Sequence, residues 1–199
     1  MVGVVLLAAC GGGDDAPAAP NTTVSDEGIG ELESLAQSLL ITVEGLGDPS
    51  FTDVGYEPRE GGPCGIDVDA ELPPSVLVGA TFFSEDRGVV VLQEIRIYES
   101  TSAAEDAFDR AEVAHSCATS VDGLTTISDA TDVTEDVGGD SARFITATGS
   151  GLHAQAVYVL VGDAVLTFGL GGQEPTDAAE ITEIAAFGTG KVLAALEAG

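Results

Sequence analysis

Two neighbouring segments, residues 76–84 and 89–98, are mainly apolar and rich in β-branched and aromatic side chains. This pattern predicts a pair of strands, joined by a turn at Glu85-Asp86-Arg87-Gly88. We expect one face of the second strand to be at least partly in contact with water, because charged residues lie on it. The pattern places Val91, Ile95 and Ile97 on one face, and Glu94 and Arg96 on the other.

A helical period of apolar residues marks three other segments, residues 29–43, 102–116 and 176–196. Ser102-Ala103-Ala104-Glu105 predicts a capping box, in which the Ser and Glu side chains bind the first free amide groups of the second helix. Each helix has an apolar stripe that we expect to be buried. The stripes are Ile29, Leu32, Ala36, Leu39, Leu40 and Val43 in the first helix, Ala104, Ala107, Phe108 and Ala111 in the second, and Ile181, Ile184, Ala185, Gly188, Val192, Ala195 and Leu196 in the third.

Further strands are predicted between the second and third helices. Residues 143–148, 153–161 and 164–170 have the pattern of a meander, with glycine-containing turns between them, and residues 125–133 form the weakest strand pattern. The element order is helix, strand pair, helix, meander and helix. We therefore predict an α+β fold with one largely antiparallel sheet packed with helices.

The N-terminal residues indicate where the protein is located. Leu7-Ala8-Ala9-Cys10 ends a short apolar run and resembles a lipobox, the cleavage site of a bacterial lipoprotein signal peptide. We expect residues 1–9 to be removed and the Cys10 thiol to carry a diacylglyceryl group, with further acylation such as palmitate. Two acyl chains anchor a protein firmly to a membrane. The alternative is a chance cysteine after an incomplete signal, since the apolar run is short and no Lys or Arg precedes it; that absence favours a start upstream of Met1.

A tether and one domain follow the anchor. Residues 10–27 contain mainly Gly, Ala, Pro, Asp, Asn, Thr and Ser, a composition that predicts a flexible tether. Residues 28–199 are long enough for one domain with its own core. We therefore expect an extracytoplasmic domain held at the cell membrane by lipid.

The charge excludes one class of partner. Lys and Arg number 6 and Asp and Glu number 34, so the net charge is −28. Nucleic-acid binding requires clusters of Lys and Arg, so we expect none. The acidic residues are spread along the chain, which favours a solvated acidic surface. Affinity for divalent cations or for a basic protein partner of the cell envelope is the alternative.

Cys64 and Cys117 remain once Cys10 is lipidated. In an oxidising compartment two such cysteines favour a disulfide, which would close a loop of about 54 residues and stabilise the domain by about 4 kcal/mol. Two buried free thiols are the alternative. A zinc site built from both cysteines with His115 and His153 lacks the usual Cys-x-x-Cys spacing.

Other candidate chemistry is weak. Ser141 lies in Gly139-Asp140-Ser141-Ala142-Arg143, which lacks the second glycine of a nucleophile elbow. Gly169-Leu170-Gly171-Gly172 has Glu174 where a dinucleotide fingerprint requires its third glycine. Asp67, Asp69 and Glu71 alternate, so in an extended segment they would share a face and bind a cation loosely. We predict no catalytic residues, no cofactor and no metal centre, and expect the protein not to be an enzyme.

Two stretches carry a resemblance to a known family. Leu39-Leu40-Ile41-Thr42-Val43-Glu44-Gly45-Leu46 and Ile95-Arg96-Ile97-Tyr98-Glu99-Ser100-Thr101-Ser102-Ala103-Ala104 resemble segments of sensor-domain lipoproteins of high-GC Gram-positive bacteria. Residues 156–172 and the terminal helix also match. The chain is similar over residues 29–196 to the extracellular sensor domain of mycobacterial serine/threonine protein kinase H.

The resemblance implies an α/β/α sandwich like that of photosystem II extrinsic proteins. It also implies binding of a small-molecule or lipid ligand beside the sheet, and it supports the Cys64–Cys117 disulfide. On the strand of residues 89–98, Val90, Leu92 and Tyr98 share one face and are our candidate ligand-binding residues. The alternatives are that all three belong to an ordinary core, and that the domain instead binds an envelope protein through its acidic surface.

Overall fold

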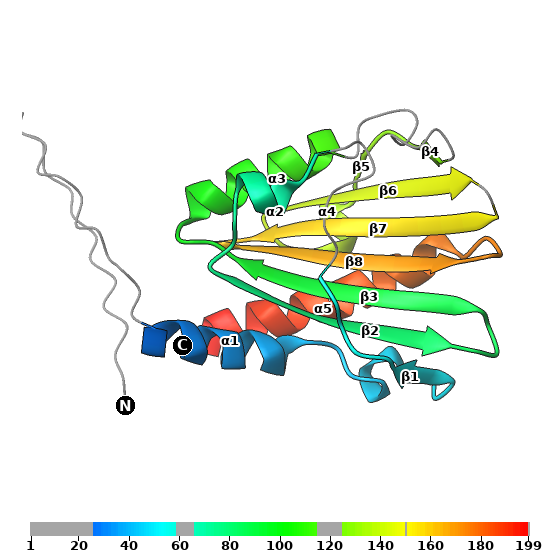
Figure 1. Cartoon of the computed structure of the whole chain (residues 1–199), viewed down its shortest axis with the longest axis horizontal. Helices are drawn as coiled ribbons and strands as arrows, with labels where there is room; N and C mark the ends of the chain where they lie inside the picture. The colour runs from blue at the N-terminus through cyan, green and yellow to red at the C-terminus, as the bar shows by residue number, and fades with distance from the viewer. Residues whose placement is uncertain (1–25, 59–65, 115–124, 150, 199) are drawn as a thin grey trace, which may run out of the picture.

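The computed structural model describes residues 26–58, 66–114, 125–149 and 151–198 (Figure 1). Its centre is an eight-stranded sheet in which every pairing is antiparallel. The strand order is β1-β2-β3-β8-β7-β6-β4, and β5 pairs with β6 beside β4. The strands are β1 Phe51–Asp53, β2 Val76–Ser84, β3 Val89–Ile97, β4 Thr126–Ile127, β5 Thr131–Asp132, β6 Ser141–Gly149, β7 Leu152–Val161 and β8 Ala164–Gly172.

Tight turns connect the long strands in the places the sequence predicts. The β2–β3 turn ends at Gly88 and the β7–β8 turn contains Gly162, with φ values of 61° and 58°. Few residues other than glycine adopt this left-handed conformation, so these two positions fix the hairpins and their register. β3 and β8, far apart in the sequence, lie side by side over their full length.

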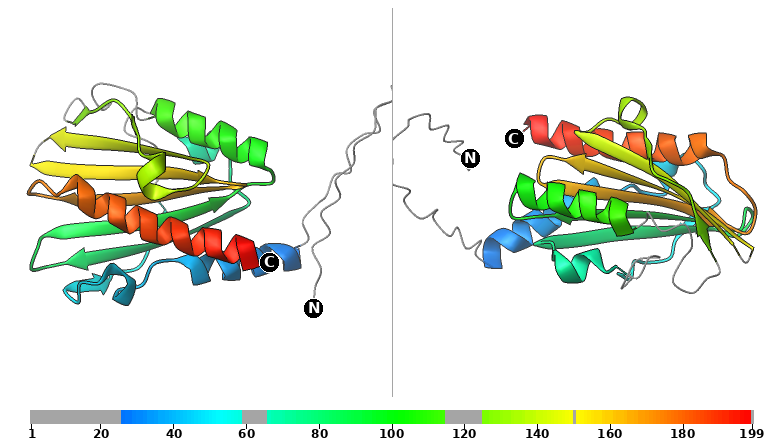
Figure 2. Two further views of the ribbon diagram at one scale, coloured as in Figure 1. Left: turned by 180° about the vertical axis from the view of Figure 1, so that it is seen from behind. Right: turned by 90° about the horizontal axis from the view of Figure 1, so that it is seen from above.

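Helices cover both faces of the sheet, which gives three layers. The helices are α1 Asp26–Leu39, the 3-10 helix η1 Glu44–Leu46, α2 Val68–Glu71, α3 Thr101–Ala114, α4 Thr134–Val137 and α5 Ala178–Ala198. Figure 2 shows α5 and α3 on opposite sides of the sheet. The predicted α+β fold, with an antiparallel sheet packed with helices, is confirmed. No helix within the described residues is long and apolar enough to cross a membrane.

The two faces bury unequal cores. The larger core lies between the sheet and helices α1 and α5, where Phe168, Leu166 and Ile181 are completely buried. A smaller cluster of buried residues packs under α3 on the opposite face. Its buried members are Tyr98, Ala104, Ala107, Phe108, Leu160 and Val165. The α3 stripe predicted from the sequence is therefore confirmed.

Several predicted boundaries are wrong. α3 begins at Thr101, and its N-terminal amide is bound by Ser100, whose Oγ accepts from the Ala103 amide at 3.2 Å; the capping box at Ser102 does not form. The first helix ends at Leu39 instead of Val43, where η1 takes over. Leu196, which the sequence predicts to lie on the buried stripe of the last helix, is 59 % exposed. It lies in the turn of α5 beyond Val192, the last buried residue of this helix.

Candidate functional site

Helix α3 covers only one end of the sheet face that it packs against (Figure 1). Tyr98, Leu160 and Val165 contribute to the cluster under α3, at the ends of their strands that adjoin this helix. Farther along the same face of β3 lie Leu92 and Val90, which are half-buried and belong to neither cluster of packed residues in the described structure. The sheet face therefore has a covered half and a half that α3 does not reach.

We call the second part the open half-face. Strand register defines it, because directly paired residues in antiparallel strands point to the same side. Val90 pairs with Gly171 and Leu92 with Gly169, and these glycines pair in turn with Ala154 and Ala156 of β7. On β2, β3, β8 and β7 the open half-face consists of Thr81, Phe83, Val90, Leu92, Leu152, Ala154, Ala156, Gly169 and Gly171.

Two large apolar side chains at the margins of the open half-face are exposed. Phe83 on β2 is 38 % exposed and Leu152 on β7 is 46 % exposed. Next to Val90 and Leu92, β8 contributes only Gly169 and Gly171, so no side chain rises from this strand between β3 and β7. A Cβ atom added at Gly171 would lie 3.6 Å from the Cβ of Ala154, which is ordinary contact. The glycines are therefore not required by close packing, and they leave a low apolar strip between higher margins.

A network of charged and polar side chains separates the open half-face from the cluster under α3. Glu94 and Arg96 lie between Leu92 and Tyr98 on the same face of β3. Arg96 binds Glu94 through Nη1 at 2.8 Å and Asp69 of α2 through Nε and Nη2, at 2.8 and 2.9 Å. The side chains of Arg96 and Glu94 are only 15 % and 7 % exposed. Because these charges are largely withdrawn from water, their mutual pairing is what makes them tolerable at this position.

Tyr56 completes the network from the segment that follows β1. Its hydroxyl donates to Glu94 Oε1 at 2.9 Å. Its ring lies on Gly79 of β2, where an added Cβ would come within 2.5 Å of the ring carbons. Gly79 is thus needed for the close approach of Tyr56 to the sheet. The network holds α2 and the Tyr56 segment against the sheet beside the open half-face.

Burial shifts the ionisation of the tyrosines around this face. Burial raises the pKa of Tyr98 to about 12. Burial, followed by the negative charge of Glu94, raises the pKa of Tyr56 and Tyr158 well above the usual range. Burial works against the charged form of Arg96, but its hydrogen bonds and ion pairs with Asp69 and Glu94 outweigh this effect and raise its pKa. The face therefore presents neutral phenols and paired charges near neutral pH.

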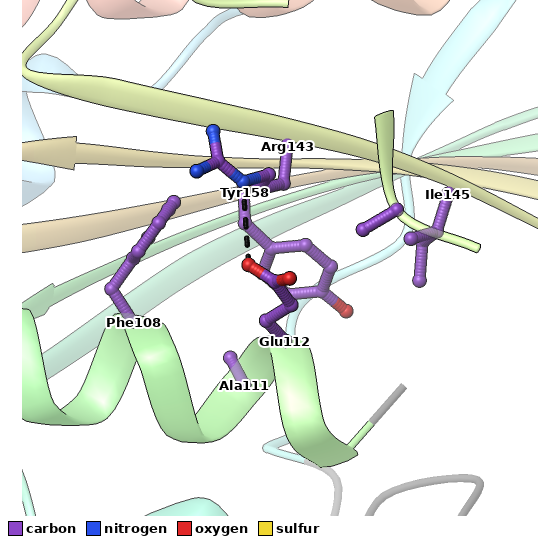
Figure 3. Close-up of a pocket in the computed structure, with 7 residues that line it drawn as sticks. Phe108, Ala111, Glu112, Arg143, Ile145 and Tyr158 are labelled. Carbon is purple, nitrogen blue, oxygen red and sulfur yellow. Dashed lines mark hydrogen bonds and ion pairs between the residues drawn. The ribbon is translucent and has the colours of Figure 1, made fainter. Parts of the chain in front are cut away.

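A small cavity lies beneath α3 (Figure 3). Phe108, Glu112, Arg143 and Tyr158 are among the residues that surround it, and Arg143 Nε lies 3.3 Å from Glu112 Oε2. Its volume of about 10 Å³ is close to the least that a single water molecule needs. This cavity is too small for any ligand larger than water.

The structure places two of the three predicted ligand-binding residues together. Val90 and Leu92 lie on the open half-face, whereas Tyr98 is 4 % exposed and belongs to the cluster under α3. The sequence alone does not indicate that Phe83 and Leu152 belong to this face. Each follows its strand's alternation onto the same side as Val90, which is the signal that identifies them once the strand pairing is known.

Asp67, Asp69 and Glu71 do not form the shared face that an extended segment would give them, because Asp67 caps a helix and residues 68–71 are helical. Asp67 caps α2 by accepting from the Ala70 amide, Asp69 binds Arg96, and Glu71 binds Arg110. Within the described ranges no three His, Cys, Asp or Glu side chains form a metal-binding group.

The cysteine predictions are not tested by the described structure. Cys10, Cys64 and Cys117, together with His115, all lie outside the described residues. The lipid anchor and the Cys64–Cys117 disulfide therefore stay predictions. Ser141 and His153 are described, and they lie on different strands, β6 and β7.

Comparison with solved structures identifies a similar fold. The extracellular domain of PknH from Mycobacterium tuberculosis matches with a TM-score of 0.60 and 15 % sequence identity, covering 81 % of this chain and 96 % of that domain. At this identity the likeness shows the fold alone. No protein-family model matches the sequence. No curated protein matches it in sequence either.

Proposed function

We propose that the chain is an extracytoplasmic lipoprotein, anchored by Cys10, whose domain binds a small apolar or lipid ligand without catalysing a reaction. The observation that carries this proposal is the open half-face, with Phe83 and Leu152 exposed at its margins and glycine between them. Exposed apolar surface on a sheet is costly in water, and larger contiguous patches mark binding sites. A ligand with an apolar body would cover this strip.

Two further observations support the location and the lack of catalysis. Leu7-Ala8-Ala9-Cys10 has the residue types of a lipoprotein cleavage site, and the solved structure with a similar fold is an extracellular domain. The polar groups next to the open half-face are engaged in ion pairs and hydrogen bonds. This arrangement is better suited to a surface that binds a ligand than to a site that transfers protons.

A melting-temperature screen of envelope lipids and metabolites tests the binding proposal. A ligand present at about 100 times its dissociation constant should raise the melting temperature by roughly 8 °C. Leu152→Asn should reduce the rise, because it removes apolar surface from the open half-face. The matched control is Leu35→Asn on α1, since Leu35 is 50 % exposed and Leu152 is 46 % exposed. Equal shifts in both variants, or no shift with any compound, would reject the site.

The anchor is tested separately. Expressed from a complete start in a bacterium that processes lipoproteins, the protein should partition with membranes and carry acyl mass on Cys10. Cys10→Ala should be released or remain uncleaved. A wild-type protein that is soluble and unacylated would refute the anchor and leave ligand binding untouched.

Docking of an envelope protein through the acidic surface is the second candidate. The observation in its favour is that every described basic side chain already has an acceptor. Arg87, Arg96, Arg110 and Arg143 form ion pairs, and Lys191 Nζ donates to the Leu40 carbonyl. The described basic side chains are thus already engaged, and the excess of acidic residues, a net charge of −28, favours interaction with external cations or basic proteins.

A further inference from the structure

An open groove lies between α4 and α5, on the sheet face opposite the open half-face. Figure 2 shows α4 beside α5. The groove has a volume of about 480 Å³, within the range of about 300–1,000 Å³ typical of ligand sites. Phe144 of β6 and Val133 line it and also pack against the larger core. On α5 the lining residues are small, among them Ala179 and Ala186, so the helix leaves room above the sheet.

Two carboxylates are the only ionisable groups among the described residues that line this groove. They are Asp136 on α4 and Glu183 on α5, and both residues are exposed. Neither forms an ion pair with a cation of the described chain. An apolar floor between two unneutralised acids is complementary to an apolar side chain flanked by basic ones.

Charge decides between the possible occupants. The chain's own N-terminal tether does not suit the groove, because no Lys or Arg precedes Arg59. A second copy would bring another net charge of −28. An anionic membrane surface would be repelled in the same way.

We propose that this α4–α5 groove binds a basic amphipathic segment of a partner protein, with apolar side chains of the segment on Phe144 and Val133 and its Lys or Arg side chains at Asp136 and Glu183. Helix-in-groove recognition uses apolar anchors at helical spacing in this way. The proposal gives a place and a partner chemistry to the docking function. It does not depend on ligand binding at the open half-face, which lies across the sheet.

The test uses the full chain in detergent and a synthetic peptide of roughly 15 residues, with Leu at i, i+3 and i+4 spacing and Lys elsewhere. Peptide binding is measured by fluorescence anisotropy. Asp136→Asn with Glu183→Gln should weaken binding about tenfold, because two exposed ion pairs are lost. The matched control is Asp109→Asn with Glu197→Gln, which changes the net charge equally at exposed sites outside the groove and should alter binding less than twofold.

A second pair of variants tests the apolar floor. Ala179→Trp should fill the groove and weaken binding at least tenfold, whereas Ala194→Trp, an exposed alanine on the same helix outside the groove, should not. A peptide with Glu in place of Lys should not bind. Equal binding of the peptide to groove and control variants would exclude the groove as the binding site, but it would not exclude docking elsewhere on the acidic surface. Failure of the Lys peptide to bind at low salt would also overturn the proposal.

Discussion

Two glycines on α5, Gly188 and Gly190, differ only in what surrounds them. Gly188 is buried, and a Cβ there would overlap the ring of Phe168 in the larger core. Gly190 is exposed, with no atom within 4 Å of an added Cβ. The same substitution should therefore have opposite effects at positions two residues apart.

Gly188→Ala should lower the free energy of unfolding by about 1–3 kcal/mol, because the packed core must shift to accept the methyl group. Gly190→Ala should raise it by about 1 kcal/mol, because alanine loses less backbone entropy in a helix. Urea denaturation of the two variants measures both values. A Gly188→Ala variant as stable as the wild type, or more stable, would mean that α5 does not lie on Phe168 as described.

At the scale of elements, the buried Glu94–Arg96–Asp69 network attaches α2 to the sheet. Arg96→Leu should cost about 3–5 kcal/mol, because it leaves Glu94 buried without its cation. The matched control is Arg110→Leu, which breaks the pair with Glu71 where the two side chains are 40 % and 46 % exposed. That change should cost less than about 1 kcal/mol.

Equal costs from Arg96→Leu and Arg110→Leu, measured by denaturant titration, would contradict the burial of the network. A useful companion is Tyr56→Phe, which removes only the hydrogen bond to Glu94. We expect it to fall between the two arginine variants, since hydrogen bonds to charged groups contribute about 1.5–3 kcal/mol.

The predicted disulfide would link the segment before α2 to the segment after α3. Peptide mapping without reductant should recover Cys64 joined to Cys117. Reduction should lower the free energy of unfolding by at most a few kcal/mol, because native strain often offsets part of the entropic gain. Stoichiometric thiol labelling of both cysteines in the native, unreduced protein would refute the link.

Long elements were predictable from sequence and short ones were not. β2 and β3 have nine residues each and are rich in β-branched and aromatic side chains, so both are clearly predicted as strands. The four-residue helices α2 and α4 are too short to show a helical period, so the sequence predicts neither of them, and the alternation of Asp67, Asp69 and Glu71 is compatible with an extended segment as well. The cap of α3 was misplaced because Ser100 and Ser102 are equally suitable residue types.

At the scale of the whole molecule, three tyrosines report the integrity of the sheet. The chain has three tyrosines and no tryptophan, so tyrosinate absorbance measures them directly. Their pKa values are all raised, chiefly by burial, and that of Tyr98 is about 12. The folded protein should show no tyrosinate near pH 10, where free tyrosine is half ionised.

The sign of the stability change follows from proton binding. Above about pH 10 the unfolded chain has lost its phenolic protons and the folded state has kept them, so the free energy of unfolding falls as pH rises. Alkaline unfolding and tyrosinate formation should therefore coincide. Tyrosinate that forms near pH 10 without loss of circular dichroism would show that the phenols are exposed.

The candidate site was only half predictable. Val90 and Leu92 could be placed on one face of a strand from alternation alone. Sequence patterns do not say which end of a face a helix covers, so Tyr98 was grouped with them although it packs under α3. Phe83 and Leu152 join the site only through strand pairing across β2, β3, β8 and β7.

Native mass spectrometry of the full chain, extracted from membranes in mild detergent, tests the central claim of ligand binding at the open half-face. The wild type should carry a noncovalent mass beyond the acyl groups on Cys10, and this mass should be lost on unfolding. Gly171→Val should fold but lack it, because an added Cβ there meets Ala154 only at ordinary contact distance while the side chain fills the strip. A wild type without extra mass, or a variant that retains the same mass, would contradict the claim.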